Sequence, residues 1–91
     1  MEVNLLRGDC LELMPKLAAG SVDMVLVDPP YGTTRCKWDS MIELDTMWEN
    51  VWRLTKDNAA VCIFGSEPFS STLRLSQTKF FRYDWIWHKT T

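Results

Sequence analysis

The sequence predicts an α/β protein with a mostly parallel sheet. Two nearly continuous apolar runs, residues 22–27 and 59–64, flank a stretch, residues 41–54, with apolar side chains at helical spacing. Continuous apolar runs are typical of parallel strands that are covered on both faces. Strands separated by single helices imply right-handed crossovers. Including the weaker elements at both ends, we expect the order β-α-β-α-β-α-β.

Length and composition limit the chain to one small folded unit. The chain has 91 residues, of which 46% are hydrophobic and 24% are charged, as in ordinary globular proteins. The formal net charge is −2, which excludes general attraction to phosphate as the main way of holding a partner. Any contact with nucleic acid must therefore be local.

The first elements are short. Residues 3–6 are a strand candidate, and Asp9 followed by Glu12 has the spacing of a helix-capping box, so we expect a helix from Cys10. Pro15 lacks an amide hydrogen and clashes with the preceding turn, which predicts a break there. The apolar strand at residues 22–27 follows.

The second helix has the clearest pattern. Ser40 followed by Glu43 is another capping-box signature, and Asp57-Asn58 is expected to end the helix. Its apolar face comprises Met41, Leu44, Met47, Trp48, Val51, Trp52 and Leu54. We interpret the Trp48 and Trp52 pair as core packing.

The last third is expected to contain two strands and a helix. After the strand at residues 59–64, Ser66 is a candidate cap for a helix that tolerates Pro68 in its first turn and runs to about Gln77. Residues 81–88 alternate as in a strand. One face of this strand would carry Phe81, Tyr83, Trp85 and Trp87. Such a face is more often buried against a helix than used to stack bases.

Cysteine usage and hydropathy favour a cytoplasmic protein. Cys10, Cys36 and Cys62 are odd in number and form no C-x-x-C pair, so we expect reduced thiols and no metal site. The longest apolar run, residues 59–64, is too short to cross a bilayer, and the first residues do not resemble a signal peptide. His88, the lone histidine, has no catalytic partner motif and is interpreted as a strand-surface residue.

The residues that point to chemistry form the DPPY motif, Asp28-Pro29-Pro30-Tyr31, directly after the apolar strand. Ligands of open α/β sheets bind outside the carboxyl ends of the strands. The prolines stiffen the segment, and the carbonyl of Pro29 and the carboxylate of Asp28 are acceptors that can together hold an exocyclic amine. The Tyr31 ring offers a face for stacking a base flipped out of a duplex.

This arrangement suits chemistry on the amine of adenine or cytosine. The amine is a poor nucleophile because its lone pair is delocalised into the ring. Acceptors aimed at its hydrogens stabilise the positive charge that develops when the nitrogen attacks an electrophilic methyl group. A Pro-Pro pair alone is more often a rigid turn after a strand. The complete four-residue motif after an apolar strand favours the functional interpretation.

With this motif, the chain resembles the amino-directed DNA methyltransferases that use S-adenosylmethionine, whose target-amine motif is (Asp/Asn/Ser)-Pro-Pro-(Tyr/Phe/Trp). The resemblance covers essentially all of the chain. It also includes residues 7–12, residues 21–23, Gly32 and the triplet Lys37-Trp38-Asp39. These resemble the N-terminal part of the subgroup that places the motif ahead of its cofactor loop.

The resemblance implies roles for single residues. Asp28, Pro29 and Pro30 would form the catalytic turn that holds the amine, and Tyr31 would stack on the flipped base. Asp9 and Cys10, together with Asp28, would border S-adenosylmethionine, although Asp9 is equally well explained as a helix cap. Two further residues, Lys37 and Trp38, would contact DNA phosphate and base, or form a solvated loop. Asp at position 28 favours adenine over cytosine.

The resemblance also implies an incomplete domain. The chain lacks the family's Phe-x-Gly-x-Gly cofactor loop, and Glu67 stands where the half match Phe64-Gly65 would need a second glycine. Only 27 residues precede Asp28, too few for that loop and its strands. We therefore expect residues 1–91 to form a single partial methyltransferase domain with a partial Rossmann-like fold, without the target-recognition region. Its partners would be DNA and the missing C-terminal half of the same protein, and exposed strand edges would favour self-association.

Three functions remain open from the sequence. The leading one is a site-specific DNA adenine methyltransferase, inactive as this fragment alone, with its place in a restriction-modification system or a phage undecided. The alternative is a non-catalytic nucleic-acid-binding or assembly module that uses the aromatic C-terminal strand. This strand lies in the basic segment 74–91, where Arg74, Lys79, Arg82 and Lys89 outnumber Asp84. A protein or ribosomal-RNA methyltransferase is disfavoured because such families usually place the glycine loop upstream of the motif.

Overall fold

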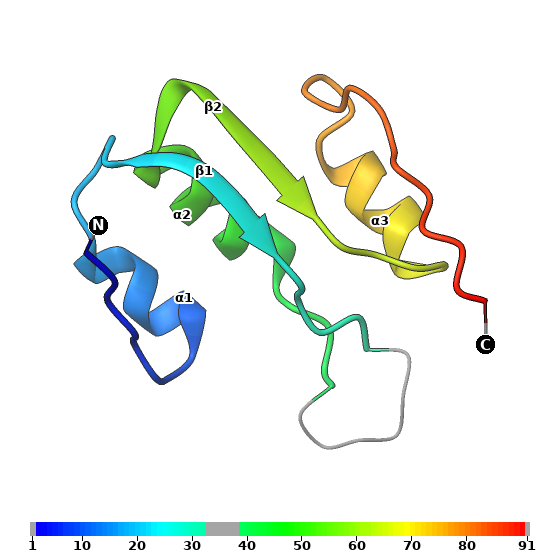
Figure 1. Ribbon diagram of the computed structural model, residues 1–91, viewed down its shortest axis with the longest axis horizontal. Coiled ribbons are helices and arrows are strands. Elements are labelled where there is room, and N and C mark those ends of the chain that lie inside the picture. Colours follow the sequence, from blue (N-terminus) through cyan, green and yellow to red (C-terminus); the bar gives the residue numbers. More distant parts are fainter. Residues whose placement is uncertain (1, 33–38, 91) are drawn as a thin grey trace.

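The computed structural model describes residues 2–32 and 39–90 (Figure 1). The elements, in chain order, are the helix α1 (Cys10–Leu13), the 3-10 helix η1 (Met14–Lys16), the strand β1 (Val22–Val27), the helix α2 (Leu44–Leu54), the strand β2 (Thr55–Ile63) and the helix α3 (Phe69–Ser76). No helix in this part of the chain combines the length and the apolar character needed to cross a bilayer.

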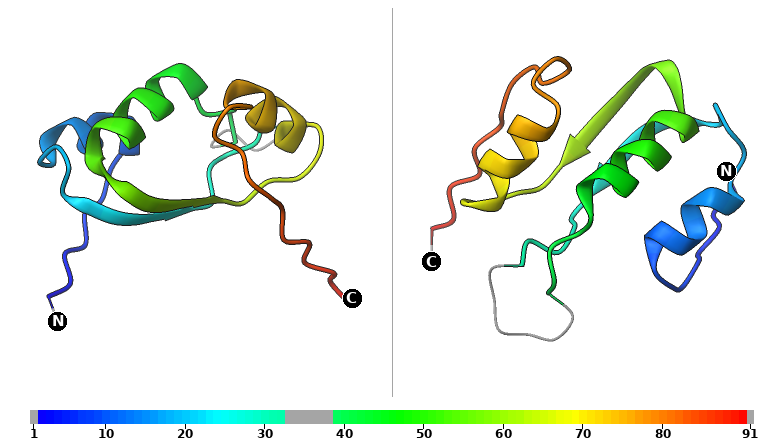
Figure 2. Two further views of the ribbon diagram at one scale, coloured as in Figure 1. Left: turned by 90° about the horizontal axis from the view of Figure 1, so that it is seen from above. Right: turned by 180° about the vertical axis from the view of Figure 1, so that it is seen from behind.

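The two strands form a parallel sheet with α2 as the crossover between them. The register runs from Met24 opposite Ala60 to Val27 opposite Ile63, with an irregularity near the start of β1. Figure 2 shows α1, α2 and α3 on the same side of this sheet. The predicted α/β class and the parallel arrangement of these two strands are therefore confirmed.

The core lies between α2 and the covered face of the sheet. It is built by Ile42, Met47, Trp48, Val51 and Phe69, with Val25, Val61 and Ile63 of the sheet packed against it. Most of the predicted apolar face of α2 is thus buried, but Trp52 is 42% exposed, and Met41 precedes the helix and is 49% exposed. Of the predicted core pair, Trp48 is buried and Trp52 is not. The indole of Trp48 stacks on that of Trp52, with centroids 5.3 Å apart, and donates to the Ser76 hydroxyl at 2.9 Å, which attaches α3 to α2.

The opposite face of the sheet is uncovered. Met24 and Leu26 alternate with the inward residues of β1 and are 53% and 66% exposed. Cys62 on β2 is also exposed. Strands of parallel sheets are usually covered on both faces and are therefore apolar on both. β1 has this composition, although only one of its faces is packed here.

The first helix follows the prediction. The carboxylate of Asp9 accepts from the Leu11 amide at 2.9 Å, so Asp9 caps α1, and the chain changes to 3-10 geometry around Pro15. The guanidinium of Arg53 donates to the carbonyls of Met14 and Leu17, both at 2.8 Å. These bonds satisfy carbonyls at the end of the turn and hold it against α2.

The second helix begins later than the capping box predicts, and Ser40 is not its cap. Glu43 is the N-cap: its carboxylate accepts from the amides of Asp45 at 3.2 Å and Thr46 at 2.7 Å. The hydroxyl and amide of Thr46 hold the pKa of Glu43 below its usual value. The amide of Ile42 instead donates to the Pro30 carbonyl at 3.2 Å. This bond holds the chain before Glu43 outside the helix.

The later boundaries also differ from the prediction. β2 already begins at Thr55, so Asp57-Asn58 lies within the strand rather than ending the helix, because Thr55 pairs with Val22 of β1. α3 exists as predicted, but its N-cap is Pro68 rather than Ser66.

The predicted strands at both ends of the chain are wrong for this structure. Residues 3–6 and 81–88 have no regular secondary structure, and the described part of the chain contains two strands rather than four. A strand needs a neighbour that pairs with its backbone groups, and neither segment has one here. The aromatic residues are consequently exposed rather than buried against a helix. Tyr83, Trp85 and Trp87 are 70%, 88% and 78% exposed.

Candidate functional site

The DPPY motif lies at the carboxyl end of the sheet, where α/β proteins bind their ligands. It follows β1 directly, and the Phe64 amide after β2 donates to the Val27 carbonyl at 2.9 Å, so the sheet extends to the start of the motif. Asp28 is exposed, Pro29 is buried, and Pro30 and Tyr31 are half-buried. The Asp28 carboxylate is thus accessible to a ligand.

Asp28 and Tyr31 are joined by a hydrogen bond. The Tyr31 hydroxyl donates to Oδ1 of Asp28 at 2.7 Å. Burial raises the pKa of Tyr31 to about 12, and the hydrogen bond and negative charge of Asp28 act in the same direction. Tyr31 therefore stays a neutral donor at physiological pH and orients the carboxylate.

The Tyr31 ring also attaches the motif to α3. It stacks on the ring of Phe69 with centroids 5.0 Å apart and an interplanar angle of 19°. Phe69 is only 2% exposed and belongs to the core. A base can consequently stack on Tyr31 only on the ring face opposite Phe69.

The turn after the motif is held by Asp39. Its Oδ1 accepts from the amide of Tyr31 at 3.0 Å and from that of Gly32 at 3.1 Å. Gly32 has a φ of +74°, and a Cβ there would lie 2.9 Å from the Cβ and backbone nitrogen of Met41. Only glycine fits this turn without strain.

Two acceptors of the motif receive no hydrogen bond from the part of the chain that the structure describes. Among residues 2–32 and 39–90, none donates a hydrogen bond to Oδ2 of Asp28 or to the carbonyl oxygen of Pro29. The exposed Asp28 carboxylate can accept a hydrogen bond from an incoming amine, whereas Pro29 itself is buried.

A cavity of about 370 Å³ lies beside the motif. It is lined by Asp9, Cys10, Leu11, Pro30 and the segment Ser40, Met41, Ile42 and Glu43. The volume falls in the range of about 300–1,000 Å³ that is common for small-molecule sites. The structure thus brings Asp9 and Cys10 together with Pro30, whereas Asp28 does not line the cavity.

The cysteine of this cavity has a thiol that is harder to ionise than a free one. Burial, and next the charge of Asp9, raise the pKa of the Cys10 thiol. A protonated thiol attacks electrophiles poorly, so Cys10 can contribute contact surface rather than covalent chemistry.

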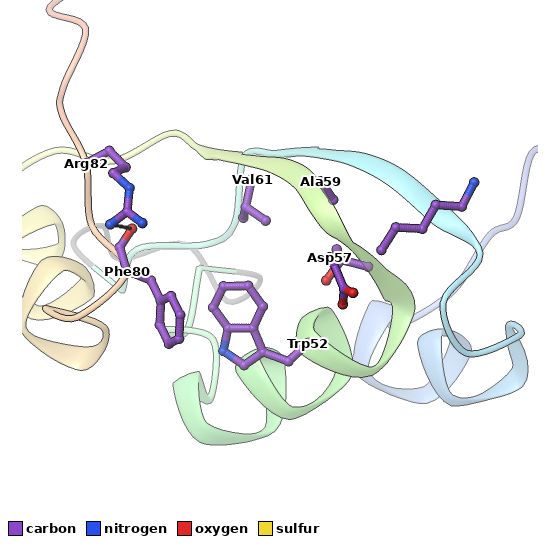
Figure 3. Close-up of a pocket in the computed structure, with 8 residues that line it drawn as sticks. Trp52, Asp57, Ala59, Val61, Phe80 and Arg82 are labelled. Atoms are coloured by element: carbon purple, nitrogen blue, oxygen red, sulfur yellow. Dashed lines mark hydrogen bonds between the residues drawn. The ribbon is translucent and has the colours of Figure 1, made fainter.

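A second cavity, of about 330 Å³, lies between α2, β2 and the segment after α3 (Figure 3). The rings of Trp52 and Phe80 contact one another there, with centroids 5.1 Å apart. Its cations already have partners: Lys56 pairs with Asp23 at 2.8 Å, and Arg82 donates to the carbonyls of Lys79 and Phe80. We assign no ligand to it.

Sequence reasoning missed three residues that build the site. Asp39 acts on a turn seven to eight residues away, Phe69 supports Tyr31 from another helix, and Glu43 caps α2 beside the cavity. Asp39 was named only as part of the Lys37-Trp38-Asp39 triplet and Glu43 only as part of a capping signature, and no local pattern marks Phe69. The proposed DNA contacts Lys37 and Trp38 lie outside the described residues.

Comparison with known proteins adds no assignment. No protein-family model matches the chain, and neither does any curated protein or solved structure. In the described part of the chain, no group of three or more His, Cys, Asp or Glu residues is placed to hold a metal ion.

Proposed function

We propose that this chain carries the target-amine pocket of an S-adenosylmethionine-dependent DNA methyltransferase that modifies the exocyclic amine of adenine or, less favoured, cytosine. One observation carries the proposal: within residues 2–32 and 39–90, no group donates to Oδ2 of Asp28 or to the carbonyl of Pro29, at the strand end beside a tyrosine. The proposal includes the finer fold, a partial Rossmann-like domain, which the β1-α2-β2 crossover supports.

The pocket residues would act on the amine by accepting hydrogen bonds from it. Asp28 and Pro29 take the two amine hydrogens, which orients the nitrogen lone pair away from them. As positive charge develops on the nitrogen, the carboxylate stabilises it, and this interaction is stronger in the transition state than in the ground state. Tyr31 holds Oδ1 of Asp28, leaving Oδ2 for the amine.

The residues of the 370 Å³ cavity fit one part of S-adenosylmethionine. Its adenosine offers hydroxyl and amine donors, and its sulfonium is positive, which suits a cavity bordered by the carboxylates of Asp9 and Glu43. Those same charges oppose its methionine carboxylate. When bound, the cofactor supplies the electrophilic methyl group. We therefore propose that a glycine-rich loop outside these 91 residues completes the cofactor site, and that this chain alone does not turn over.

Replacement of Asp9 by serine is expected to weaken cofactor binding without unfolding α1. A serine hydroxyl still caps the helix, whereas the negative charge of a residue that lines the cavity is lost. We expect about a tenfold or greater loss of affinity for S-adenosylmethionine in isothermal titration calorimetry, since a hydrogen bond to a charged group contributes about 1.5–3 kcal/mol. Glu12→Gln, in the same turn but not lining the cavity, is the matched control. Equal affinity in Asp9→Ser and the wild type would leave Asp9 a helix cap only.

The proposed amine recognition is tested by deleting the amine from the base. Two labelled oligothymidine strands are compared by fluorescence anisotropy, one with a single adenine and one with purine, which lacks the amine, at that position. Thymine itself has no exocyclic amine. We expect the adenine strand to bind about tenfold tighter or more, because each acceptor left without its donor costs about 1–3 kcal/mol. Equal affinity for the two strands would overturn the proposal.

A second candidate function is supported by the exposure of the C-terminal aromatics. Tyr83, Trp85 and Trp87 are exposed, and only the rings of Tyr83 and Trp85 contact one another, with centroids 6.2 Å apart. Exposed rings can stack on single-stranded bases. If the chain is a nucleic-acid-binding module of this kind, binding of the labelled strands should survive Asp28→Ala and be lost in Trp85→Ala. The methyltransferase pocket predicts that discrimination between adenine and purine depends on Asp28.

A further inference from the structure

We propose that Asp39 is the positioning residue of the site: it sets the path of the DPPY motif and thereby the relative placement of Asp28 and Tyr31. This inference rests on the proposed function for its chemical meaning. It concerns a residue that makes no contact with the amine itself and acts through the backbone of the motif.

The burial of Asp39 requires strong compensation. The residue is 7% exposed, although aspartate is rarely buried unless its charge is satisfied. Its Oδ1 receives two consecutive backbone amides, at 3.0 and 3.1 Å. Hydrogen bonds between amides and an ionised carboxylate are stronger than neutral ones. The geometry is that of a fixed anchor rather than of a solvated loop residue.

The two prolines explain why this anchor matters. Neither Pro29 nor Pro30 has an amide hydrogen, so the motif cannot be held through its own donors at those positions. The first amides after the pair belong to Tyr31 and Gly32, and both are taken by Asp39. From the same segment, Ile42 donates to the Pro30 carbonyl. Residues 39–42 thus hold the last two residues of the motif and Gly32 directly after it.

The position of the Tyr31 side chain follows from this backbone placement. Its ring lies on Phe69 and its hydroxyl reaches Asp28 at 2.7 Å only while the turn keeps its path. Functional groups need to be held within about 0.5 Å of the productive geometry. Loss of the anchor is therefore expected to separate the Tyr31 hydroxyl from Asp28.

The test measures the ionisation of the Tyr31 phenol. Its pKa depends on the contact with Asp28 and can be measured without any enzymatic activity. The chain has two tyrosines, so a Tyr83→Phe background leaves Tyr31 as the only one. NMR titration of labelled tyrosine carbon is compared for the background, Asp39→Ala and Asp39→Asn. Asp45→Asn, an exposed aspartate on α2, is the matched control.

We expect the background and the control to resist ionisation, since the pKa of Tyr31 is raised to about 12. In Asp39→Ala the midpoint should fall by about one pH unit or more, because the phenol loses its burial and its contact with the negative carboxylate of Asp28. Asp39→Asn keeps the shape and one acceptor oxygen, so it should stay folded by circular dichroism and shift by less. If Asp39→Asn and a folded Asp39→Ala both titrate as the background does, Asp39 does not position Tyr31.

A second readout separates this inference from the proposed function. The same variants are measured with the adenine and purine strands. If Asp39→Ala shifts the titration while the wild type fails to discriminate the strands, the anchor stands and the proposed function fails. If the wild type discriminates and Asp39→Ala changes neither readout, the function stands and the anchoring role fails. The result we expect is a shifted titration together with at least a fivefold loss of discrimination.

Discussion

Alanine at position 28 is expected to remove the preference for adenine over purine while leaving the fold intact. Asp28 is exposed, so its side chain contributes little packing. A hydrogen bond from the amine to a charged acceptor contributes about 1.5–3 kcal/mol, which corresponds to about a 10- to 150-fold loss of affinity for the adenine strand. Anisotropy titrations of both strands measure this effect.

Two further variants show whether the loss is specific to the pocket. Asp28→Asn keeps one acceptor oxygen but no charge, and is expected to bind the adenine strand with intermediate affinity. Asp57→Ala removes an exposed carboxylate beside the second cavity and should leave both affinities unchanged. Undiminished adenine preference in Asp28→Ala would show that another group recognises the amine.

Removal of the Phe69 ring is expected to have the largest effect on stability. Phe69 is 2% exposed, packs in the core with α2 and supports the ring of Tyr31. Phe→Ala changes at such positions cost about 3–5 kcal/mol, against a total of about 5–15 kcal/mol for ordinary domains. Urea unfolding followed by circular dichroism should therefore show a large drop in the unfolding midpoint.

The same helix provides the matched control. Leu75 lies on α3 and is 75% exposed, so Leu75→Ala should change the free energy of unfolding by only about 0.5 kcal/mol. A Phe69→Ala cost of the same size as that of Leu75→Ala would contradict the packing of Tyr31 and α2 on this ring.

The central elements were predictable because their signals are local. The apolar run of β1 and the helical spacing in α2 each require only neighbouring residues, and both elements lie close to where they were expected. The end segments were not predictable in the same way. Residues 81–88 alternate like a strand, but a strand forms only beside a partner, and pattern alone does not supply one.

The candidate site also has a part that the sequence predicts and a part that it does not. The sequence places the DPPY motif at the end of a parallel strand, and the structure has it there. The sequence does not indicate that Asp39 anchors the turn or that Phe69 lies under Tyr31, because both contacts are made by the folding of distant segments. The helix start also moved from Ser40 to Glu43, since Ile42 is bound to Pro30 instead.

The most direct test of the account is the magnetic resonance of the amine itself. An oligothymidine strand with one adenine, labelled with ¹⁵N at its exocyclic amino group, is titrated with the wild type and with Asp28→Ala. The account predicts that the amino resonances shift as hydrogen bonds form to Asp28 and Pro29, and that the Asp28→Ala variant abolishes most of this shift. Amino resonances that stay at their free positions while the strand is bound by the wild type would contradict it.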